Sequence, residues 1–458
     1  MSLLLSSTEF KKPKPDKARL LAYDLISQVN REGAYANLRL PDLLKASQLE
    51  QRDKALATEL SYGTLRMQGR YDYFIALKID RPIEELDPKI LDLLRLGIHQ
   101  IEYMRIPDHA AVSATVEVAR FVAGESKASY VNAILRAITR DETTFNAIDT
   151  DAKLTDIQKL AVKHSHPEWI VKAFYDQLKD WAAVEELLII DNQPAAPHLV
   201  AWPGKSTVSD LAKTGGTPLP LSSFALLSDH LPTEYPEIMS RQAGVQDVGS
   251  QVVAETFFNT KDLNRVGPMS WLDLCAGPGG KAALLYNLVE TELPEDSFLA
   301  NEPAEHRAEL VARVVPSTLV VSHDGRDVAS FGKSFDRILV DAPCTGLGAL
   351  RRRPEARWRR TPADLKNLVT LQRELLDSAY ELINPGGVIG YATCSPHLAE
   401  TVGQVLDFTY RHKDMKVIPV AEFEHLPTGG EKSDGTLQLW THLTGSDSMF
   451  LALLQKQG

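Results

Sequence analysis

Two of the three cysteines in this 458-residue chain stand where an apolar stretch runs into a turn. Cys344 ends "FDRILVDAPC" (335–344), and Cys394 ends "GVIGYATC" (387–394). A single cysteine in such a place is most often a small buried hydrophobic residue. Here Asp341 stands three residues before one thiol, and a run of arginines begins seven residues after it. Because nearby cations lower the pKa of a thiol from its usual ~8.5, this pattern favours a nucleophilic role.

A glycine-rich turn, "LDLCAGPGGK" (272–281), is the second feature that could bind a ligand. Its glycines allow positive φ and let backbone N–H groups approach a ligand closely. The spacing matches neither the dinucleotide fingerprint nor the P-loop, so we expect no NAD and no triphosphate. The next two apolar stretches end at Glu302 and Asp324, which could bind the ribose hydroxyls and the amino group of an adenosine. S-adenosylmethionine, which is positively charged at sulfur, suits such an acidic pocket.

The arginine run between 351 and 360 holds six arginines and one glutamate in a chain of net charge −11. The overall acidity argues against indiscriminate nucleic-acid binding. Such a run is usually a solvated helix face, but its place just after Cys344 favours contact with an anion such as phosphate. The candidate phosphate-binding residues are Arg351, Arg352, Arg353, Arg357, Arg359 and Arg360.

Composition excludes several other classes of protein. No apolar run approaches the ~20 residues of a membrane span. Three cysteines without paired spacing predict neither a disulfide framework nor a metal site. The N-terminal residues 1–20 lack the order of charge and apolar stretch that a secretory signal has. We therefore expect a cytoplasmic protein with reduced thiols, no membrane partner and no metal.

The length predicts two or three domains. Residues 1–145 show apolar residues at helical spacing, for example Leu21, Leu25 and Val29, and predict a helical bundle. Residues 146–240 are broken by prolines, apart from a helix predicted after Pro167, and predict a small mixed linking domain. Residues 241–458 alternate short apolar stretches with helical ones, which predicts a parallel sheet covered by helices. The stretches 436–443 and 448–456 are expected to pair as a hairpin that closes this sheet.

At these motifs the chain resembles the RNA cytosine-C5 methyltransferases. "LDLCAGPGGK" resembles their cofactor-binding motif, while "DAPCTGLGALRRRPEARW" (341–358) and "YATCSPHLAE" (391–400) resemble their two cysteine motifs. "QDVGSQ" (246–251) resembles the segment that leads into their catalytic core. "DRPIEELDPKILDLLRLGIHQIEYMRIPDHAAV" (80–112) and "YVNAILR" resemble the NusB-like domain of the bacterial Sun/RsmB subgroup, which acts on 16S ribosomal RNA.

The resemblance implies a multidomain protein: an all-α NusB-like RNA-binding domain, a linking and RNA-contacting domain, and an α/β Rossmann-like class I methyltransferase core. It implies that Cys394 attacks C6 of a cytosine, that Cys344 assists release of the product, and that Asp341 hydrogen-bonds the cytosine. It also implies S-adenosyl-L-methionine as cofactor, 16S ribosomal RNA as partner and a monomer. The implied cofactor-contacting residues are Cys275, Ala276, Gly277, Pro278, Gly279, Gly280, Lys281, Glu302, Asp324 and Asp341.

Three alternatives remain open from the sequence. The first is a methyltransferase with a non-RNA substrate, although oxygen or nitrogen methylation needs no thiol nucleophile. The second is a NusB-like RNA-binding or antitermination protein with an inert methyltransferase-like domain. The third treats both thiols as packing residues. The sequence alone does not identify the target nucleotide. It leaves open whether the substrate is naked RNA or a partly assembled ribosomal subunit, and whether the helical domain determines specificity.

Overall fold

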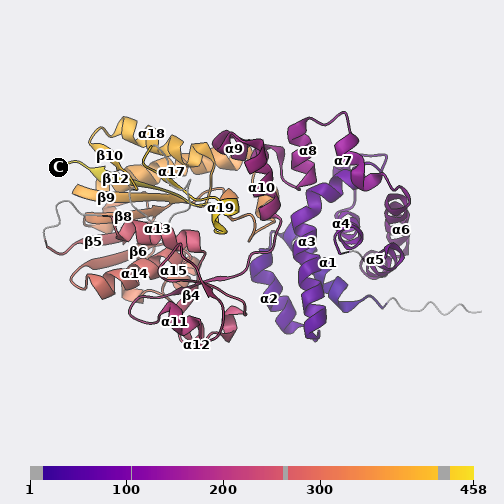
Figure 1. Ribbon diagram of the computed structural model, residues 1–458, viewed down its shortest axis with the longest axis horizontal. Coiled ribbons are helices and arrows are strands. Elements are labelled where there is room, and N and C mark those ends of the chain that lie inside the picture. The colour runs from indigo at the N-terminus through magenta and orange to yellow at the C-terminus, as the bar shows by residue number, and fades with distance from the viewer. Residues whose placement is uncertain (1–13, 105, 261–266, 421–433) are drawn as a thin grey trace, which may run out of the picture. The chain divides into compact units, whose positions relative to one another are not determined.

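The computed structural model describes residues 14–104, 106–260, 267–420 and 434–458, which divide between two compact units (Figure 1). The helical unit comprises Met1–Val171 and Arg353–Trp358, and the sheet unit comprises Lys172–Arg352 and Arg359–Gly458. The prediction that the protein is not exported rests on residues 1–20. Of these, residues 1–13 lie outside the described residues. Within the described ranges, no helix is long and apolar enough to cross a membrane.

Helices dominate the first third of the chain, and strands appear only after residue 197. The helices are α1 (Lys17–Glu32), α2 (Ala36–Ala46), α3 (Gln51–Ala76), α4 (Pro88–Glu102), α5 (Asp108–Ala123), α6 (Glu125–Arg140), α7 (Ala147–Thr150), α8 (Asp156–Lys163), α9 (Glu168–Leu178), α10 (Trp181–Asp191), α11 (Val208–Leu211), α12 (Pro236–Met239), α13 (Val248–Phe258), α14 (Gly280–Glu292), α15 (Glu305–Val311), α16 (Ala356–Arg359), α17 (Pro362–Leu382), α18 (Val402–Arg411) and α19 (Thr441–Thr444). The strands are β1 (His198–Ala201), β2 (Thr217–Pro218), β3 (Ala225–Leu227), β4 (Ala243–Val245), β5 (Ser270–Asp273), β6 (Ser297–Asn301), β7 (Val320–Val321), β8 (Phe335–Asp341), β9 (Ile383–Thr393), β10 (Met415–Ile418), β11 (Leu437–Gln438) and β12 (Phe450–Lys456).

The helical unit confirms the bundle predicted from apolar spacing. Leu25 and Val29 of α1 are buried in its core, together with residues of α3 to α6. Helix α4 begins as its sequence indicates, because the Asp87 side chain accepts a hydrogen bond from the Lys89 N–H at 2.8 Å. Pro88 occupies the first helical position, where its missing N–H is not needed.

The helical unit also contains a short segment from the second half of the chain, Arg353–Trp358. The Glu355 carboxylate accepts a hydrogen bond from the Ala36 N–H at 3.3 Å. The Trp358 ring lies against Gly69 of α3 so closely that a Cβ at Gly69 would stand 2.1 Å from it. The arginine-rich motif is therefore partly a structural element of the helical unit.

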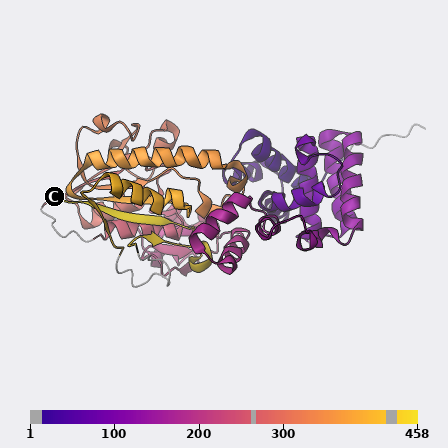
Figure 2. The same cartoon turned by 90° about the horizontal axis from the view of Figure 1, so that it is seen from above.

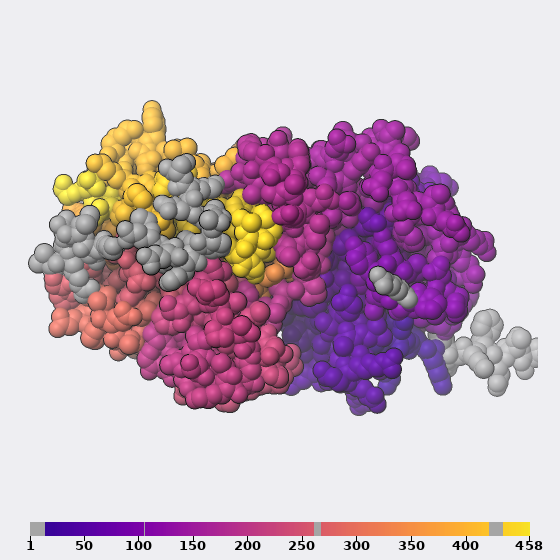
Figure 3. All heavy atoms as spheres, viewed as in Figure 1, coloured from indigo at the N-terminus to yellow at the C-terminus, as the bar shows by residue number. Residues whose placement is uncertain are grey.

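Residues 146–240 contribute to both units, because the boundary passes through α9. This helix begins at Glu168, as predicted. Strands β1 to β4 form a separate antiparallel sheet in the order β2-β3-β1-β4. In the space-filling view, the magenta and pink atoms of this small sheet pack directly against the rest of the sheet unit (Figure 3).

The large sheet has the order β10-β12-β9-β8-β5-β6-β7, and β5 to β9 run parallel, as predicted. β11 pairs with β12 antiparallel, as the hairpin prediction requires. The prediction is wrong for residues 441–443, which lie in α19. Gly445 adopts a φ of +70° and ends a helical turn there. β10 was not predicted. β12 pairs with β10 along one edge and with β9 along the other.

Helices cover both faces of the large sheet (Figure 1). α13 and α14 pack in one apolar core with Trp271 and Leu339, and α17 and α18 pack in another with Ile338 and Tyr391. The view from above shows the long orange helix α17 lying along its face of the sheet (Figure 2). Because β5 to β9 are parallel, all their carboxyl ends meet at one edge, where a ligand can bind.

Candidate active site

The two cysteines lie side by side, although 50 residues separate them in the sequence. The Cys344 Sγ stands 3.3 Å from the Cys394 Sγ. Parallel strands β8 and β9 pair Asp341 with Ala392, so the turns that follow the strands emerge together. The Gly348 N–H donates to the Cys394 carbonyl oxygen at 2.9 Å, which ties the first turn to the second. The structure thus brings together the cysteines that the sequence singled out.

The two thiols have opposite pKa shifts, and a shared hydrogen bond is the largest cause of both. The hydrogen bond from Cys344 lowers the pKa of Cys394, although burial opposes this. The same hydrogen bond and then burial raise the pKa of Cys344 well above its ordinary value. The pKa of Cys394 is therefore the lower of the two, which makes Cys344 the better donor of the pair.

Lys281 lies beside Asp341, directly behind the cysteines. Its Nζ stands 2.9 Å from the Asp341 Oδ2, and the lysine is buried. Burial alone would lower the pKa of Lys281, but the charge and hydrogen bond of Asp341 raise it. The lysine is therefore charged, and its charge also helps to lower the pKa of Cys394.

The glycine-rich turn between β5 and α14 has Glu302 packed against it. A Cβ at Gly277 would stand 2.0 Å from the Glu302 Oε2, so this acid can lie there only because position 277 has no side chain. Arg307 donates to the Gly277 carbonyl oxygen at 2.6 Å and stands 3.4 Å from the Glu302 carboxylate. Gly279 adopts a φ of +115°, a conformation that favours glycine. Arg307 was not predicted, since no spacing in the sequence connects it with the turn.

Asp273, at the end of β5, has an unsatisfied buried oxygen. Burial and then the charge of Asp341 raise the pKa of Asp273 to about 8. One carboxyl oxygen accepts from the Cys275 N–H at 3.3 Å, and the other has no hydrogen-bond partner. Burial also raises the pKa of the Cys275 thiol well above its ordinary value. A buried polar atom left without a partner is uncommon, and it fits a ligand that supplies a polar partner.

Asp324 follows β7 at the same edge of the sheet, but its side chain is exposed and already paired. Arg326 contacts both of its carboxylate oxygens and also reaches Glu374 at 3.0 Å. The hydrogen bond from Arg326 lowers the pKa of Asp324 to about 2. A ligand amino group would have to share this carboxylate with Arg326.

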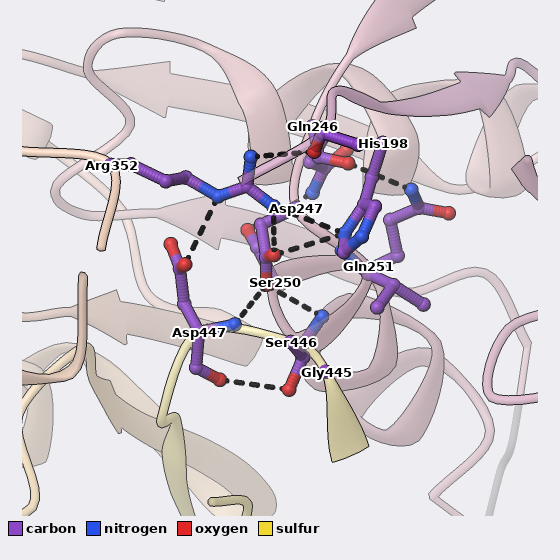
Figure 4. Close-up of polar contacts among 12 residues, drawn as sticks. His198, Gln246, Asp247, Ser250, Gln251, Arg352, Gly445, Ser446 and Asp447 are labelled. Carbon is purple, nitrogen blue, oxygen red and sulfur yellow. Dashed lines mark hydrogen bonds and ion pairs between the residues drawn. The ribbon is translucent and has the colours of Figure 1, made fainter. Parts of the chain in front are cut away.

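Arg352 is the centre of an ion-pair network in the sheet unit (Figure 4). Its guanidinium stands 2.8 Å from the Asp247 Oδ1 and 3.0 Å from the Asp447 Oδ1. It also donates to the Ala196 carbonyl oxygen at 3.1 Å and stands 3.2 Å from the His198 Nδ1. This arginine therefore joins segments around the small sheet to the loop after α19.

The two carboxylates of this network have different pKa values. Burial and then the charge of Asp247 raise the pKa of Asp447 to about 7. Burial alone would also raise the pKa of Asp247, but the hydrogen bond to His198 and the charge of Arg352 lower it. Arg352 thus stabilises two buried acids, which is a structural role that the sequence did not predict.

The burial of Arg357 contradicts its predicted contact with phosphate. Its side chain is fully buried in the helical unit, where it donates to the Ser165 carbonyl oxygen at 3.1 Å. Arg351 donates to the Gly445 carbonyl oxygen at 2.7 Å. The other members of the run are the exposed Arg353 and the half-buried Arg359 and Arg360. Arg357 is therefore not available to an anion.

Comparison with known proteins gives the same division of the chain. Residues 261–455 match the family described as 16S rRNA methyltransferase RsmB/F, and residues 16–140 match the NusB family. A putative methyltransferase of Mycobacterium tuberculosis is 46% identical over 452 residues, which cover 96% of this chain and 97% of that protein. The probable ribosomal RNA small subunit methyltransferase B of Bacillus subtilis is 29% identical over 464 residues, 97% of this chain and 100% of that protein.

Among solved structures, that of PH0851 has a TM-score of 0.79 and 20% sequence identity, and covers 97% of this chain and 100% of that one. This likeness shows a shared fold. The methyltransferase and NusB matches lie on the two parts of the chain whose resemblance the sequence indicated. With the 46% identity to the mycobacterial relative over nearly the whole chain, they show that the chain belongs to the RsmB/F family of 16S rRNA methyltransferases, with a NusB-family domain at its N-terminal side.

Proposed function

We propose that the chain transfers a methyl group from S-adenosyl-L-methionine to C5 of a cytosine in 16S ribosomal RNA, through a covalent bond between Cys394 and C6. The observation that carries this proposal is the pair of thiols 3.3 Å apart, with the pKa of Cys394 lowered and that of Cys344 raised. A methyltransferase for oxygen or nitrogen has no use for such a pair, because those atoms are already nucleophilic.

The residues around the glycine-rich turn fit the proposed cofactor, which supplies the methyl group when bound. Glu302 lies against Gly277, where a carboxylate can accept hydrogen bonds from ribose hydroxyls. The unpartnered oxygen of Asp273 suits a polar group on the ligand. Acidic groups also favour a ligand with positive charge. We retain Asp324 as a contact to the adenine amino group, shared with Arg326.

Cys394 and Asp341 activate the base in the first step. The Cys394 thiolate adds to C6 and forms a C–S bond, which moves the electrons of the C5–C6 double bond toward C5. C5 then takes the methyl group, and the sulfonium becomes a neutral thioether. Asp341, held at 2.9 Å by Lys281, hydrogen-bonds the edge of the cytosine and favours its activated form.

Cys344 acts in the second step, which releases the product. Once Cys394 is bonded to carbon it has no charge, so the main cause of the raised pKa of Cys344 disappears. Cys344 then loses its proton to solvent and accepts the proton from C5. The electrons of the C5–H bond restore the double bond and expel Cys394 as a thiolate, which regenerates the starting pair.

The RNA must present the cytosine outside any base stack, because both cysteines are half-buried at the carboxyl edge of the sheet. Arg353, Arg359 and Arg360 are the members of the arginine run that we assign to phosphates. The NusB-family domain adds a second RNA-binding surface in this proposal.

Nucleoside analysis tests the position of the methyl group. Wild-type protein is mixed with unmodified 16S ribosomal RNA and S-adenosylmethionine, and the RNA is digested and examined by mass spectrometry. The proposal predicts 5-methylcytidine, and no product from Cys394→Ala. Methylation of ribose or of an exocyclic nitrogen would overturn the proposal, and so would full activity of Cys394→Ala.

A further inference from the structure

A buried carboxylate, Glu400, lies behind the turn that follows β8. Its side chain is fully buried, and the structure records no ion pair for it among the described residues. One carboxylate oxygen accepts from the Thr345 N–H at 2.8 Å and from the Gln372 amide at 3.1 Å. The other accepts from the Thr345 hydroxyl. Removing a carboxylate from water without a cation costs several kcal/mol, and these hydrogen bonds have to offset that cost.

Thr345, which donates to Glu400, links the two cysteine turns through the residue that follows each cysteine. Thr345 follows Cys344, and Ser395 follows Cys394. The hydroxyl oxygens of Thr345 and Ser395 are 3.1 Å apart, and both side chains are buried. The residues that continue each cysteine turn are therefore hydrogen-bonded to each other, and Glu400 holds one of them from behind.

The direction of these hydrogen bonds follows from the available hydrogens. A carboxylate only accepts, so the Thr345 hydroxyl gives its hydrogen to Glu400. Ser395 must then donate to the Thr345 oxygen, while its own oxygen accepts from the His397 N–H at 3.2 Å. The chain of donors runs in one direction, from His397 through Ser395 and Thr345 to Glu400, and every hydroxyl hydrogen has an acceptor.

The same amide that contacts Glu400 also holds the residue before Cys344. The Gln372 amide nitrogen donates to the Pro343 carbonyl oxygen at 2.8 Å. The Tyr391 hydroxyl donates to the Glu400 carbonyl oxygen at 2.8 Å and stands 3.3 Å from the Gln372 oxygen. Polar groups that Glu400 and Gln372 supply therefore fix both neighbours of Cys344 in the sequence, Pro343 and Thr345.

We propose that Glu400 is a positioning residue that holds Cys344 against Cys394 for the release of the methylated product. This inference rests on the proposed function. Cys394 follows the long strand β9 directly, so its position depends on strand pairing. Cys344 lies in a turn, and its position depends on the hydrogen bonds of its neighbours. A displacement of about 1 Å in such a group lowers the rate of its step on the order of 10²-fold.

Glu400→Gln keeps the size of the side chain and disturbs the chain of donors. The oxygen that accepts from two N–H groups must remain an oxygen, so the new amide nitrogen faces the Thr345 hydroxyl as a donor. Thr345 then has to turn its hydrogen toward Ser395, whose own hydrogen loses its acceptor. Thr345→Val removes the hydroxyl link but leaves the Thr345 N–H on Glu400.

The experiment measures the methyl transferred in the first turnover and the fraction of protein bound covalently to RNA on a denaturing gel. The substrates are 16S ribosomal RNA and S-adenosylmethionine. In Glu400→Gln and Thr345→Val we expect first-turnover transfer within ~3-fold of wild type and a covalent fraction at least ~10-fold above it, because only release is slowed. Glu255→Gln is the matched control, since Glu255 is a buried acid of the sheet unit that accepts from the Ser223 N–H at 3.1 Å. It should behave as wild type.

Cys344→Ala, run on the same gel, separates failure of this inference from failure of the proposed function. If Cys344→Ala traps RNA but Glu400→Gln and Thr345→Val do not, Glu400 has no role in release and the inference is overturned. Parallel loss of transfer and of adduct in both variants would overturn it as well, since that result indicates general damage. If Cys344→Ala itself traps no RNA, the proposed function is overturned and the inference with it.

Discussion

At the scale of single residues, one hydrogen bond shifts the pKa values of the two thiols in opposite directions. The Sγ atoms stand 3.3 Å apart, and the interaction lowers the pKa of Cys394 and raises that of Cys344. The charge of Lys281 also lowers the pKa of Cys394, but the charge of Asp341 raises it by more. The ionisation of Cys394 therefore depends on its neighbour more than on any cation.

Alkylation by iodoacetamide tests this dependence. Because the Cys344 S–H stabilises the Cys394 thiolate, Cys344→Ala should raise the pKa of Cys394. The pH midpoint of Cys394 alkylation, followed by mass spectrometry, should then move up, and the rate at neutral pH should fall. Cys344→Ser keeps a donor and should move the midpoint less. A midpoint that stays the same or moves down in Cys344→Ala would contradict this explanation.

Arg352 has a structural role that differs from the predicted phosphate contact. Removing it would leave Asp247 and Asp447 buried without their cation, so we expect Arg352→Ala to lower the free energy of unfolding by about 3–5 kcal/mol. The exposed Arg353 serves as control, and Arg353→Ala should change stability by less than about 0.5 kcal/mol. Urea denaturation measures both. Wild-type stability of Arg352→Ala together with weaker RNA binding would instead assign Arg352 to phosphate.

The sequence predicted some of these residues and missed others for a physical reason. The sequence indicated Cys344, Cys394 and Asp341, because each stands at the end of an apolar stretch. Such an end is visible in the local sequence pattern. Thr345 and Ser395 were not indicated, because their hydrogen bond depends on the register of β8 against β9. No local pattern contains that register.

At the scale of elements, parallel strands place the candidate groups at one edge of the sheet. The apolar stretches predicted all five strands from β5 to β9. Residues 441–443 were predicted as part of a strand and lie in α19, since Gly445 ends a helical turn there. The four residues of β10, Met415–Ile418, were not predicted as a strand.

The turn between β5 and α14 gives a prediction for cofactor binding. A Cβ at Gly277 would stand 2.0 Å from the Glu302 carboxylate, so Gly277→Ala must displace this acid. We expect the dissociation constant for S-adenosylmethionine, measured by calorimetry, to rise at least ~10-fold, which corresponds to the loss of about one charged hydrogen bond. Gly97→Ala is the matched control, since its Cβ would stand 2.7 Å from the Leu135 side chain in the helical unit and leaves the turn unchanged. Equal affinity in both variants would contradict the assignment of Glu302 to the ribose.

At the scale of the whole molecule, the chain order does not match the division into units. The segment Arg353–Trp358 lies in the second half of the sequence but belongs to the helical unit. The sequence predicted the helical bundle and the sheet domain correctly, because each has its own apolar period. It could not predict that Arg353–Trp358 belongs to the helical unit, because no sequence pattern indicates that Trp358 contacts Gly69.

Gly69→Ala tests how firmly this segment is packed. A methyl group would stand 2.1 Å from the Trp358 ring, and such overpacking costs about 1–3 kcal/mol. Thermal unfolding of the helical unit should therefore shift to lower temperature. Trp358→Leu makes room, so the double variant should be more stable than the sum of the two single changes predicts. If Gly69→Ala instead stabilises the protein by the ~1 kcal/mol that alanine gains over glycine in a helix, Trp358 does not pack there.

The most direct measurement of the proposed chemistry is a denaturing gel of Cys344→Ala mixed with unmodified 16S ribosomal RNA and S-adenosylmethionine. Cys394 can form its bond to C6 in this variant, but Cys344 cannot assist release. We predict a covalent protein–RNA band that needs the cofactor and is absent from the double variant Cys344→Ala/Cys394→Ala. If Cys344→Ala gives no band and Cys394→Ala still methylates the RNA, the thiols are packing residues and the covalent mechanism is wrong.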